Sequence, residues 1–305
     1  MDVSTIIVSY NTRELTRTCL ASVFEKTHGV DFEVIVVDNA SEDGSAAMIR
    51  ESFPKVMLIE SSTNLGFAAA NNVAFKRAKG KYFFLLNPDT VLLNNAIRMF
   101  YEFMEDGQNQ QVAAVGGYLL DEQRRVHHSY GEFVSLREFG LDAAGIRFTL
   151  KRGARNVLMA LLGQRLFTRL ARVWRRPDAA TSQTRLPEAQ ASATSPRKVD
   201  YVTGADLFLR KSVLDEVGVF DERFFLYAEE MDLQYRTRKA GYASLVIPGP
   251  EIVHFETQSI GRTEKHGLLE PAKLEFLRKH SPLKYAACRL AGLRSSGVQA
   301  RWNGA

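Results

Sequence analysis

The sequence predicts an α/β fold in which a mostly parallel, Rossmann-like central sheet is flanked by helices. Over about the first 120 residues, short apolar runs alternate with runs of helical spacing, the order typical of parallel strands joined by helices. The strand-like runs are apolar at successive positions, which indicates strands buried on both faces. Polar residues follow several runs directly, at the sheet edge where such folds bind ligands.

Five apolar runs define the expected strands of the first half, because each is short and bounded by polar or turn residues. They are Val3–Ser9, Phe32–Val37, Val56–Ile59, Tyr82–Leu86 and Val112–Val115. Between them lie four expected helices, and in the first of these Leu15, Cys19 and Val23 fall on one side. The helices are Thr12–Phe24, Gly44–Glu51, Phe67–Ala78 and Asn95–Met104.

Regular segments resume near residue 199, after a long interruption. The expected strands there are Val199–Val202, Asp206–Leu209, Ala243–Ile247 and Ile252–His254. The expected helices are Tyr227–Ala240, Leu274–His280 and Ala286–Leu293.

The interruption begins with a basic segment. Residues 147–176 include nine arginines or lysines and no acidic residue. On a helical wheel an arginine stripe adjoins an apolar face, as in an interfacial helix on an anionic membrane. The stripe is Arg165, Arg169, Arg172 and Arg176, and the apolar face is Leu162, Leu166, Leu170, Val173 and Trp174. A helix packed on the domain with solvated arginines remains an open alternative. Residues 177–197, poor in large apolar side chains, predict a flexible loop.

The composition limits the classes of protein and partner. The 305 residues are 45% hydrophobic and carry a net charge of +5, which suits a globular protein with a core and admits anionic partners. Cys19 and Cys288 are too few and too far apart for a disulfide framework, so we expect a reducing cytosol. No uncharged apolar run is long enough to predict a spanning helix.

Three carboxylates gather at the expected start of the helix Tyr227–Ala240. Glu229, Glu230 and Asp232 follow an aromatic and apolar run. Acidic side chains this close repel one another unless a cation, a basic partner or a proton transfer uses them. At a helix start they can point into a cleft, where a general base acts. The alternative is a helix N-terminus whose solvated acids are favoured by the helix dipole.

Asp38 and Gly66 lie where strands give way to helices. A carboxylate at a strand's carboxyl end can accept hydrogen bonds from a base or a ribose hydroxyl. The alternative, an Asx turn before the next helix, suits Ser41 or Asp43 better. Gly66 would let a helix N-terminus approach a diphosphate, although turn glycines are common.

Asp89 follows the expected strand Tyr82–Leu86 in the sequence Asn-Pro-Asp. A carboxylate there can hold Mg²⁺ or Mn²⁺, which usually takes one or two protein oxygens together with substrate phosphates. A plain turn is the alternative, because Asn-Pro favours turns. His254 lies on a short apolar strand. Alone it is best interpreted as a core or surface histidine, and a ligand role requires that Asp89 lie nearby.

Seven segments of the chain, in this order, resemble the motifs of family 2 glycosyltransferases of the GT-A fold, in particular the rhamnosyltransferase-like branch. They are Ile7–Asn11, Val36–Ser45, Asn64–Phe67 with Asn71, Leu86–Thr90, Thr203–Ala205, Phe224–Gly241 and His254. Each is weak alone, and their shared order makes the resemblance specific. It covers about residues 1–125 and 199–260, and the basic segment and the loop fall outside it.

The resemblance implies a role for each matching residue. Those implied in binding the nucleotide sugar are Ser9, Tyr10, Asn11, Asp38, Asn64, Gly66, Asn87 and Asp89. Asp89, as the last residue of a DXD-like motif, and His254 would hold Mg²⁺ or Mn²⁺. Glu230 would deprotonate the acceptor hydroxyl. The implied acceptor side comprises Gly204, Ala205 and Asp232.

Two departures from the family pattern concern the chemistry. The DXD-like motif begins with Asn87, which leaves one carboxylate and predicts a weakly held metal. The usual Glu-Asp pair is here Glu229-Glu230. Because glutamate is one methylene longer than aspartate, Glu229 is a second candidate for the base.

The resemblance implies an inverting hexosyltransferase that moves a sugar from dTDP-rhamnose or a UDP-sugar to a hydroxyl of a cell-surface glycan or a lipid-linked saccharide. One alternative is a nucleotidyltransferase, which would normally show a glycine-rich basic loop where this chain has Tyr10–Arg13. Another is a non-catalytic protein that binds nucleotides or a membrane. Nucleic acid is not an expected partner, because no segment at the sheet edge interleaves aromatic and basic residues.

The same reasoning divides the chain. Residues 1–125 would form the nucleotide-sugar-binding half and residues 199–260 the acceptor and catalytic half of one GT-A domain. Residues 126–198 would be a basic helical insertion with its loop, and residues 261–305 a C-terminal helical extension. We expect a cytoplasmic protein, attached peripherally to the anionic inner face of the plasma membrane.

Overall fold

A computed structural model of the protein describes residues 1–127, 129–139, 195–255, 262–290 and 293. The chain forms two compact units, one from Met1–Phe133 and Leu186–Leu269 and one from Val134–Arg185 and Glu270–Ala305. The basic segment 147–176 lies outside the described residues, as does most of the loop 177–197. Their expected structure, and the division of the chain at residues 125, 198 and 260, stay predictions.

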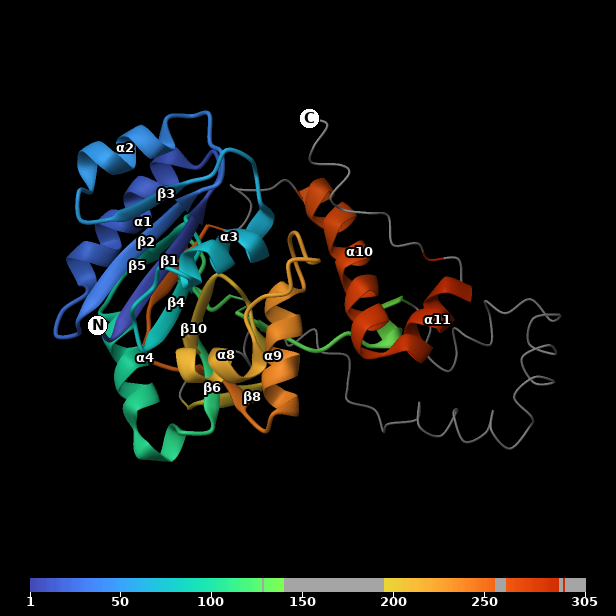
Figure 1. The fold of residues 1–305 in the computed structure, drawn as a ribbon. Coiled ribbons are helices and arrows are strands. Elements are labelled where there is room, and N and C mark those ends of the chain that lie inside the picture. The colour runs from blue at the N-terminus through green and yellow to red at the C-terminus, as the bar shows by residue number, and fades with distance from the viewer. Residues whose placement is uncertain (128, 140–194, 256–261, 291–292, 294–305) are drawn as a thin grey trace, which may run out of the picture. The chain divides into compact units, whose positions relative to one another are not determined.

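The first unit is built on an eight-stranded sheet with the order β3-β2-β1-β4-β10-β6-β11-β8 (Figure 1). Its strands are β1 Val3–Ser9, β2 Phe32–Asp38, β3 Met57–Glu60, β4 Tyr82–Leu86, β6 Val112–Gly117, β8 Arg197–Val199, β10 Asp206–Arg210 and β11 Ala243–Ile247. Strands β3, β2, β1 and β4 run parallel to one another, and β6 runs parallel to β11. Strand β10 runs antiparallel to both β4 and β6, and β8 antiparallel to β11. The predicted mostly parallel α/β sheet is confirmed.

Helices cover both faces of this sheet (Figure 1). One core contains the inward side chains of α1 Arg13–Lys26, α2 Ser45–Ser52 and α4 Ala96–Glu105, packed on Ile7 and Phe84 of the sheet. The other core contains those of α3 Gly66–Phe75, α8 Lys211–Val217 and α9 Glu229–Lys239. Successive residues of each strand face opposite cores, which explains why the strands are apolar throughout.

Two small sheets complete this unit. Strand β5 Thr90–Leu92 pairs with β12 Ile252–His254, and β7 Tyr130–Gly131 pairs with β9 Tyr201–Val202. A short 3₁₀ helix at Gly107–Asn109 follows α4. Neither β5 nor α8 was expected from the sequence, because both are too short to show a clear period.

The C-terminal helices begin earlier than the sequence predicts. Helix α10 spans Arg262–His280 rather than starting at Leu274, and it contains Pro271. Proline usually ends or kinks a helix. For this reason the sequence pattern does not predict the first half of α10. Helix α11 spans Pro282–Leu290, with the proline in its first turn where the missing N–H costs nothing. In the second unit Lys273 forms an ion pair with Glu138 of a 3₁₀ helix at Leu136–Phe139.

Candidate active site

The structure brings Asp89 and His254 together. Nε2 of His254 lies 3.3 Å from Oδ1 of Asp89, with side chains 11% and 2% exposed. The approach follows from backbone pairing: His254 lies opposite Thr90 in the β5–β12 ladder, and the N–H of Phe255 donates to the carbonyl of Asp89 at 2.9 Å. The condition set for a ligand role of His254, proximity to Asp89, is therefore met.

The turn before β5 is held by residues that sequence reasoning missed. The hydroxyl of Thr90 donates to the carbonyl of Asn87 at 2.7 Å, and the thiol of Cys19 lies 3.6 Å from the same carbonyl. Burial raises the pKa of Cys19 to about 12, so it stays a neutral thiol. No sequence signal marked Cys19, because its partner is distant in the chain.

The same turn adjoins the loop predicted to face the acceptor. The N–H of Asn87 donates to the carbonyl of Ala205 at 3.0 Å, and Asp206 lies opposite Leu86 in the β10–β4 ladder. A side chain at Gly204 would lie 3.1 Å from the ring of Phe67, so the loop passes close to α3. The sheet thus places the Gly204-Ala205 loop beside the DXD-like turn.

The donor atoms at Asp89 and His254 fit a divalent cation that also binds a diphosphate. Within the described residues, no group of three or more His, Cys, Asp and Glu side chains is arranged to hold a metal. One carboxylate and one imidazole can still hold Mg²⁺ or Mn²⁺ when phosphate oxygens and water supply the other ligands. Nδ1 of His254 is buried and has no hydrogen-bond partner among the described residues, so no second hydrogen bond fixes the tautomer of the ring.

Asp38 ends β2 at the same edge of the sheet. Its Oδ2 accepts a hydrogen bond from the N–H of Ser41 at 3.1 Å, while Oδ1 is buried without a hydrogen-bond partner among the described residues. The helix-start interactions fall to Asp43, as expected, because it accepts from the N–H groups of Arg13 and Ser45 at 2.8 and 3.0 Å. Asp38 therefore keeps one oxygen that can accept a hydrogen bond.

At the end of β1, Tyr10 and Asn11 lie at the surface, whereas Ser9, the last residue of the strand, is buried. Tyr10 is 39% exposed. Asn11 adopts a left-handed φ of 53° and accepts from the N–H of Glu42 at 2.8 Å, which ties this loop to the one after β2. Ser9 differs from the prediction that it lines a pocket. It is fully buried, and its hydroxyl bonds to Thr12 and Thr16 at 3.1 and 3.0 Å inside the protein.

The N-terminus of α3 has a different use from the one predicted. Asn64 accepts from the N–H of Gly66, the first residue of α3, at 2.9 Å, and the N–H of Phe67, the second, donates to the carbonyl of Phe225 at 2.7 Å. Gly66 has a φ of +77°, and a Cβ there would lie 2.3 Å from that carbonyl. The approach of Phe225, rather than of a diphosphate, accounts for the glycine.

Glu229, which is buried, and Glu230, which is half-buried, form a carboxyl pair at the start of α9. Oε2 of each is buried without a hydrogen-bond partner among the described residues. Burial raises the pKa of Glu229 well above its usual range, and the neighbouring Glu230 raises it further. Burial also raises the pKa of Glu230, which its backbone hydrogen bonds and the hydrogen bond to Glu229 oppose. Burial thus favours the neutral form of Glu229 more strongly than that of Glu230.

The helix starts here because Tyr227 and Ala228 adopt left-handed φ values of 69° and 68°. The expected helix start at Tyr227 thus shifts to Glu229. Asp232, predicted on the acceptor side, is fully buried and pairs with Arg236, with Oδ2 3.0 Å from Nε. This placement favours an internal role for Asp232 over contact with an acceptor.

The family model described as "Glycosyl transferase family 2" matches residues 4–159, which include Asp38 and Asp89. The chain belongs to glycosyl transferase family 2. It is a glycosyltransferase, and the resemblance found in its motifs is confirmed.

Two relatives of this glycosyltransferase are themselves named for saccharide synthesis. An N-acetylglucosaminyl-diphospho-decaprenol L-rhamnosyltransferase of Mycobacterium tuberculosis is 26% identical over 285 residues, which cover 86% of this chain and 81% of that protein. The O-antigen biosynthesis protein RfbC of Myxococcus xanthus is 26% identical over 257 residues, covering 83% of this chain and 17% of that protein.

Solved structures share the fold of this glycosyltransferase. A mannosyltransferase from Pyrobaculum calidifontis, in complex with GDP-Man and Mn²⁺, gives a TM-score of 0.57 at 17% identity, covering 94% of this chain and 69% of that one. GalNAc-T7 with UDP, GalNAc and Mn²⁺ gives 0.63 at 11% identity, covering 99% and 53%. At these identities the likeness shows the GT-A fold alone. No helix among the described residues has the length and apolar character to cross a membrane.

Proposed function

We propose that the protein is a metal-dependent inverting glycosyltransferase that moves a hexose from a nucleotide diphosphate sugar to a hydroxyl of a lipid-linked saccharide or cell-surface glycan. The observation that carries the proposal is the 3.3 Å approach of His254 Nε2 to Asp89 Oδ1 at the carboxyl edge of the sheet. A carboxylate and an imidazole at that edge would suit a divalent cation that binds together with a diphosphate.

The donor would lie along the carboxyl ends of β1, β2 and β4. Asp38 would accept a hydrogen bond from the base through Oδ1, and the exposed ring of Tyr10 would cover the base. Asp89 and His254 would hold Mg²⁺ or Mn²⁺, which when bound neutralises the charge that develops on the leaving diphosphate. The Mn²⁺ in both solved relatives' complexes supports the choice of ion.

Glu230 would act as the general base. It accepts the proton of the acceptor hydroxyl as that oxygen attacks the anomeric carbon on the face opposite the leaving diphosphate, so the configuration inverts without a covalent intermediate. Burial of its carboxyl group raises the pKa of Glu230, which makes it a better proton acceptor than a solvated glutamate. Burial raises the pKa of Glu229 well above its usual range, which disfavours a second negative charge beside Glu230.

The relatives support a donor and an acceptor class. The rhamnosyltransferase of M. tuberculosis favours dTDP-rhamnose as donor, with UDP-sugars next, and a saccharide-diphosphate lipid as acceptor. Such an acceptor lies in a membrane, so we also propose that the enzyme works at the inner face of the plasma membrane.

Transfer assays on the full chain test the proposal. The donors are dTDP-rhamnose, UDP-glucose and UDP-N-acetylglucosamine, each with Mn²⁺, with Mg²⁺ or with EDTA. The acceptor is N-acetylglucosaminyl diphosphate on a short prenol, and NMR reports the anomeric configuration of the product. We expect an inverted glycoside formed only with metal. Transfer that persists in EDTA would overturn the metal role, and a retained configuration would overturn the mechanism.

A further inference from the structure

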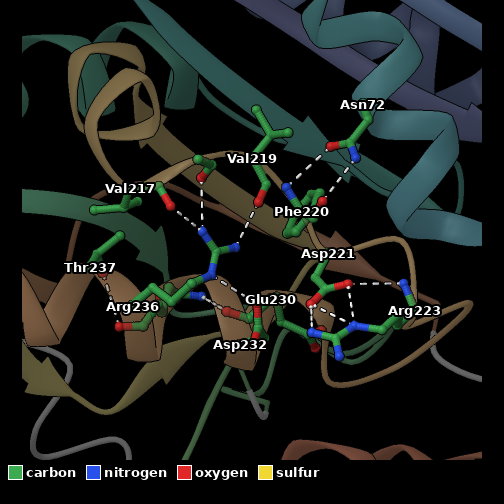
Figure 2. Close-up of polar contacts among 12 residues, drawn as sticks. Asn72, Val217, Val219, Phe220, Asp221, Arg223, Glu230, Asp232, Arg236 and Thr237 are labelled. Carbon is green, nitrogen blue, oxygen red and sulfur yellow. Dashed lines mark hydrogen bonds and ion pairs between the residues drawn. The ribbon is translucent and has the colours of Figure 1, made fainter. Parts of the chain in front are cut away.

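The segment that joins α8 to the turn before α9 is held by one arginine (Figure 2). Nη1 of Arg236 donates to the carbonyls of Val217 and Gly218 at 2.6 and 3.0 Å, and Nη2 donates to the carbonyl of Val219 at 2.7 Å. Its Nε donates to Oδ2 of Asp232 at 3.0 Å. All three guanidinium nitrogens are thus engaged, and three of the four acceptors belong to one stretch of backbone.

The same segment is held from α3 on its other side (Figure 2). The amide of Asn72 makes a reciprocal pair with the backbone of Phe220, with Nδ2 2.9 Å from its carbonyl and Oδ1 3.2 Å from its N–H. Nδ2 also lies 3.0 Å from Oε1 of Glu222. The ring of Phe220 stacks on Phe75 of α3 with centroids 5.7 Å apart. We name the set Asn72, Asp232 and Arg236 the clamp.

The clamp holds the beginning of the segment that leads to the carboxyl pair Glu229 and Glu230. From Phe220 the backbone passes through the left-handed residues Tyr227 and Ala228 into Glu229. Non-glycine residues adopt this conformation only where the surroundings enforce it. The carbonyl of Phe225 is fixed by the amide of Phe67 at 2.7 Å. Contacts from α3 and α9 therefore hold this segment at residues 217–220 and again at Phe225, just before the turn into α9.

Helix stability alone does not account for this arrangement. The pair Arg98–Glu102 on α4 has the same i,i+4 spacing at 2.7 Å, but its side chains are 47% and 56% exposed and solvated. The Asp232–Arg236 pair is 0% and 19% exposed. Burying an ion pair costs desolvation that apolar side chains of similar size avoid. The cost is offset when the ion pair holds in one conformation a segment that carries a catalytic group.

We propose that Asp232, Arg236 and Asn72 are positioning residues that set the carboxylate of Glu230 for proton transfer. The inference rests on the proposed function, in which Glu230 is the base. The clamp acts through the backbone of residues 217–228 rather than by contact with substrate. A misplacement of a catalytic group by about 1 Å can lower the rate about 10²-fold.

The first experiment separates turnover from binding. Arg236→Gln, Asp232→Asn and Asn72→Ala are compared with the wild type and with the control Arg98→Gln, and calorimetry measures nucleotide diphosphate affinity. We expect kcat to fall about 10- to 100-fold in the clamp variants, with donor affinity and KM within about twofold. Arg236→Lys keeps the charge but loses the planar guanidinium group, so its kcat should lie between those of the wild type and Arg236→Gln. Unchanged kcat in all three clamp variants would overturn the inference, as would an equal loss in Arg98→Gln.

A double-mutant cycle shows whether the clamp acts through Glu230. In the Glu230→Gln background, Arg236→Gln should add less than about a twofold loss, because the group it positions no longer acts as a base. Losses that multiply would mean an independent structural effect and would overturn the inference. If Arg236→Gln fails to fold, the isosteric Asp232→Asn takes its place in the cycle.

The cycle also separates this inference from the proposed function. Full turnover in Glu230→Gln would show that the base assignment is wrong, and both proposals would then fail. Loss of turnover in Glu230→Gln with full kcat in the clamp variants would leave the proposed function standing and overturn the positioning role alone.

Discussion

Nε2 of His254 and Oδ1 of Asp89 lie 3.3 Å apart, although the two residues come from opposite halves of the chain. The β5–β12 ladder fixes this relationship, because it pairs His254 with Thr90, the residue next to Asp89. Backbone pairing places the histidine within reach of any cation that the carboxylate holds.

Asp89→Ala should abolish transfer and remove the metal dependence of nucleotide diphosphate binding, because a bridging cation loses its carboxylate ligand. Calorimetry with dTDP or UDP, with and without Mn²⁺, measures this. Asp215→Ala serves as the control, since that carboxylate is exposed on α8 and pairs with Lys211. Metal-dependent affinity that survives in Asp89→Ala would contradict the role.

Glu230→Gln and Glu229→Gln should differ. Glu230→Gln keeps the size but loses the basicity, so turnover should fall about 10²-fold or more while donor binding stays intact. Because burial favours the neutral form of Glu229, its replacement by glutamine should leave turnover within several-fold of the wild type. Steady-state kinetics at saturating donor decide. The reverse pattern would move the base to Glu229.

Asp206 should make the fold less stable as the pH rises. It is fully buried, and burial raises its pKa well above the usual range, against the effect of the Gly117 N–H that donates to Oδ2 at 2.6 Å. The folded state favours the neutral acid. This contribution to stability is complete below the pKa of the unfolded chain, about 3.9, and is lost as the pH rises to the folded pKa.

Asp206→Asn removes that titration and keeps an acceptor for Gly117. The free energy of unfolding at pH 7 should exceed that of the wild type, and the difference should shrink as the pH falls towards 4, by about 1.4 kcal/mol per pH unit between the two pKa values. Urea unfolding between pH 4 and 8 measures the difference. A difference independent of pH would exclude a raised pKa.

Ala228→Gly should stabilise the fold and slow the enzyme. A left-handed φ costs a non-glycine residue about 1–2 kcal/mol, while glycine loses about 0.5–1 kcal/mol through the entropy of the unfolded chain. The net gain should be up to about 1 kcal/mol by urea unfolding. Because the turn that aims Glu230 becomes less restricted, kcat should fall at unchanged donor affinity. Destabilisation by glycine would show that the turn carries no strain.

The basic segment 147–176, outside the described residues, should bind anionic liposomes. Each basic residue near such a surface contributes about 1 kcal/mol, so the four-arginine stripe gives reversible binding that salt weakens. Replacing the stripe by glutamine should abolish co-sedimentation and spare transfer to a short water-soluble acceptor. The stripe is Arg165, Arg169, Arg172 and Arg176. Liposome binding that does not weaken with salt concentration would favour the alternative of a helix packed on the domain.

The sequence predicts the parallel strands and their helices because each strand is apolar throughout. It does not predict β10 as an antiparallel strand between β4 and β6, since a short apolar run looks the same in both directions. Strand β5 was missed because the three residues Thr90–Leu92 are too few to show a repeated alternation.

The site divides in the same way. The motif residues Asp38, Asp89 and Glu230 could be proposed from the sequence because each lies close to the end of a strand or the start of a helix. The burial of Ser9 and Asp232 could not be predicted, because it depends on residues that are distant in the sequence. The i,i+4 spacing of Asp232 and Arg236 could be seen in the sequence. The hydrogen bonds from Arg236 to the backbone of residues 217–219 could not be predicted, because they join separate elements.

The place of β10 has a consequence for biosynthesis. Strands β4 and β6 are synthesised first, but they do not pair with each other. The strand that lies between them is β10, Asp206–Arg210, and it emerges from the ribosome only after the intervening residues. At common translation rates that interval is on the order of ten seconds. During it, two apolar edges remain unpaired and can recruit other nascent chains. A fragment that ends before Arg210 should therefore aggregate, and the nascent chain should depend on chaperones until β10 completes the sheet.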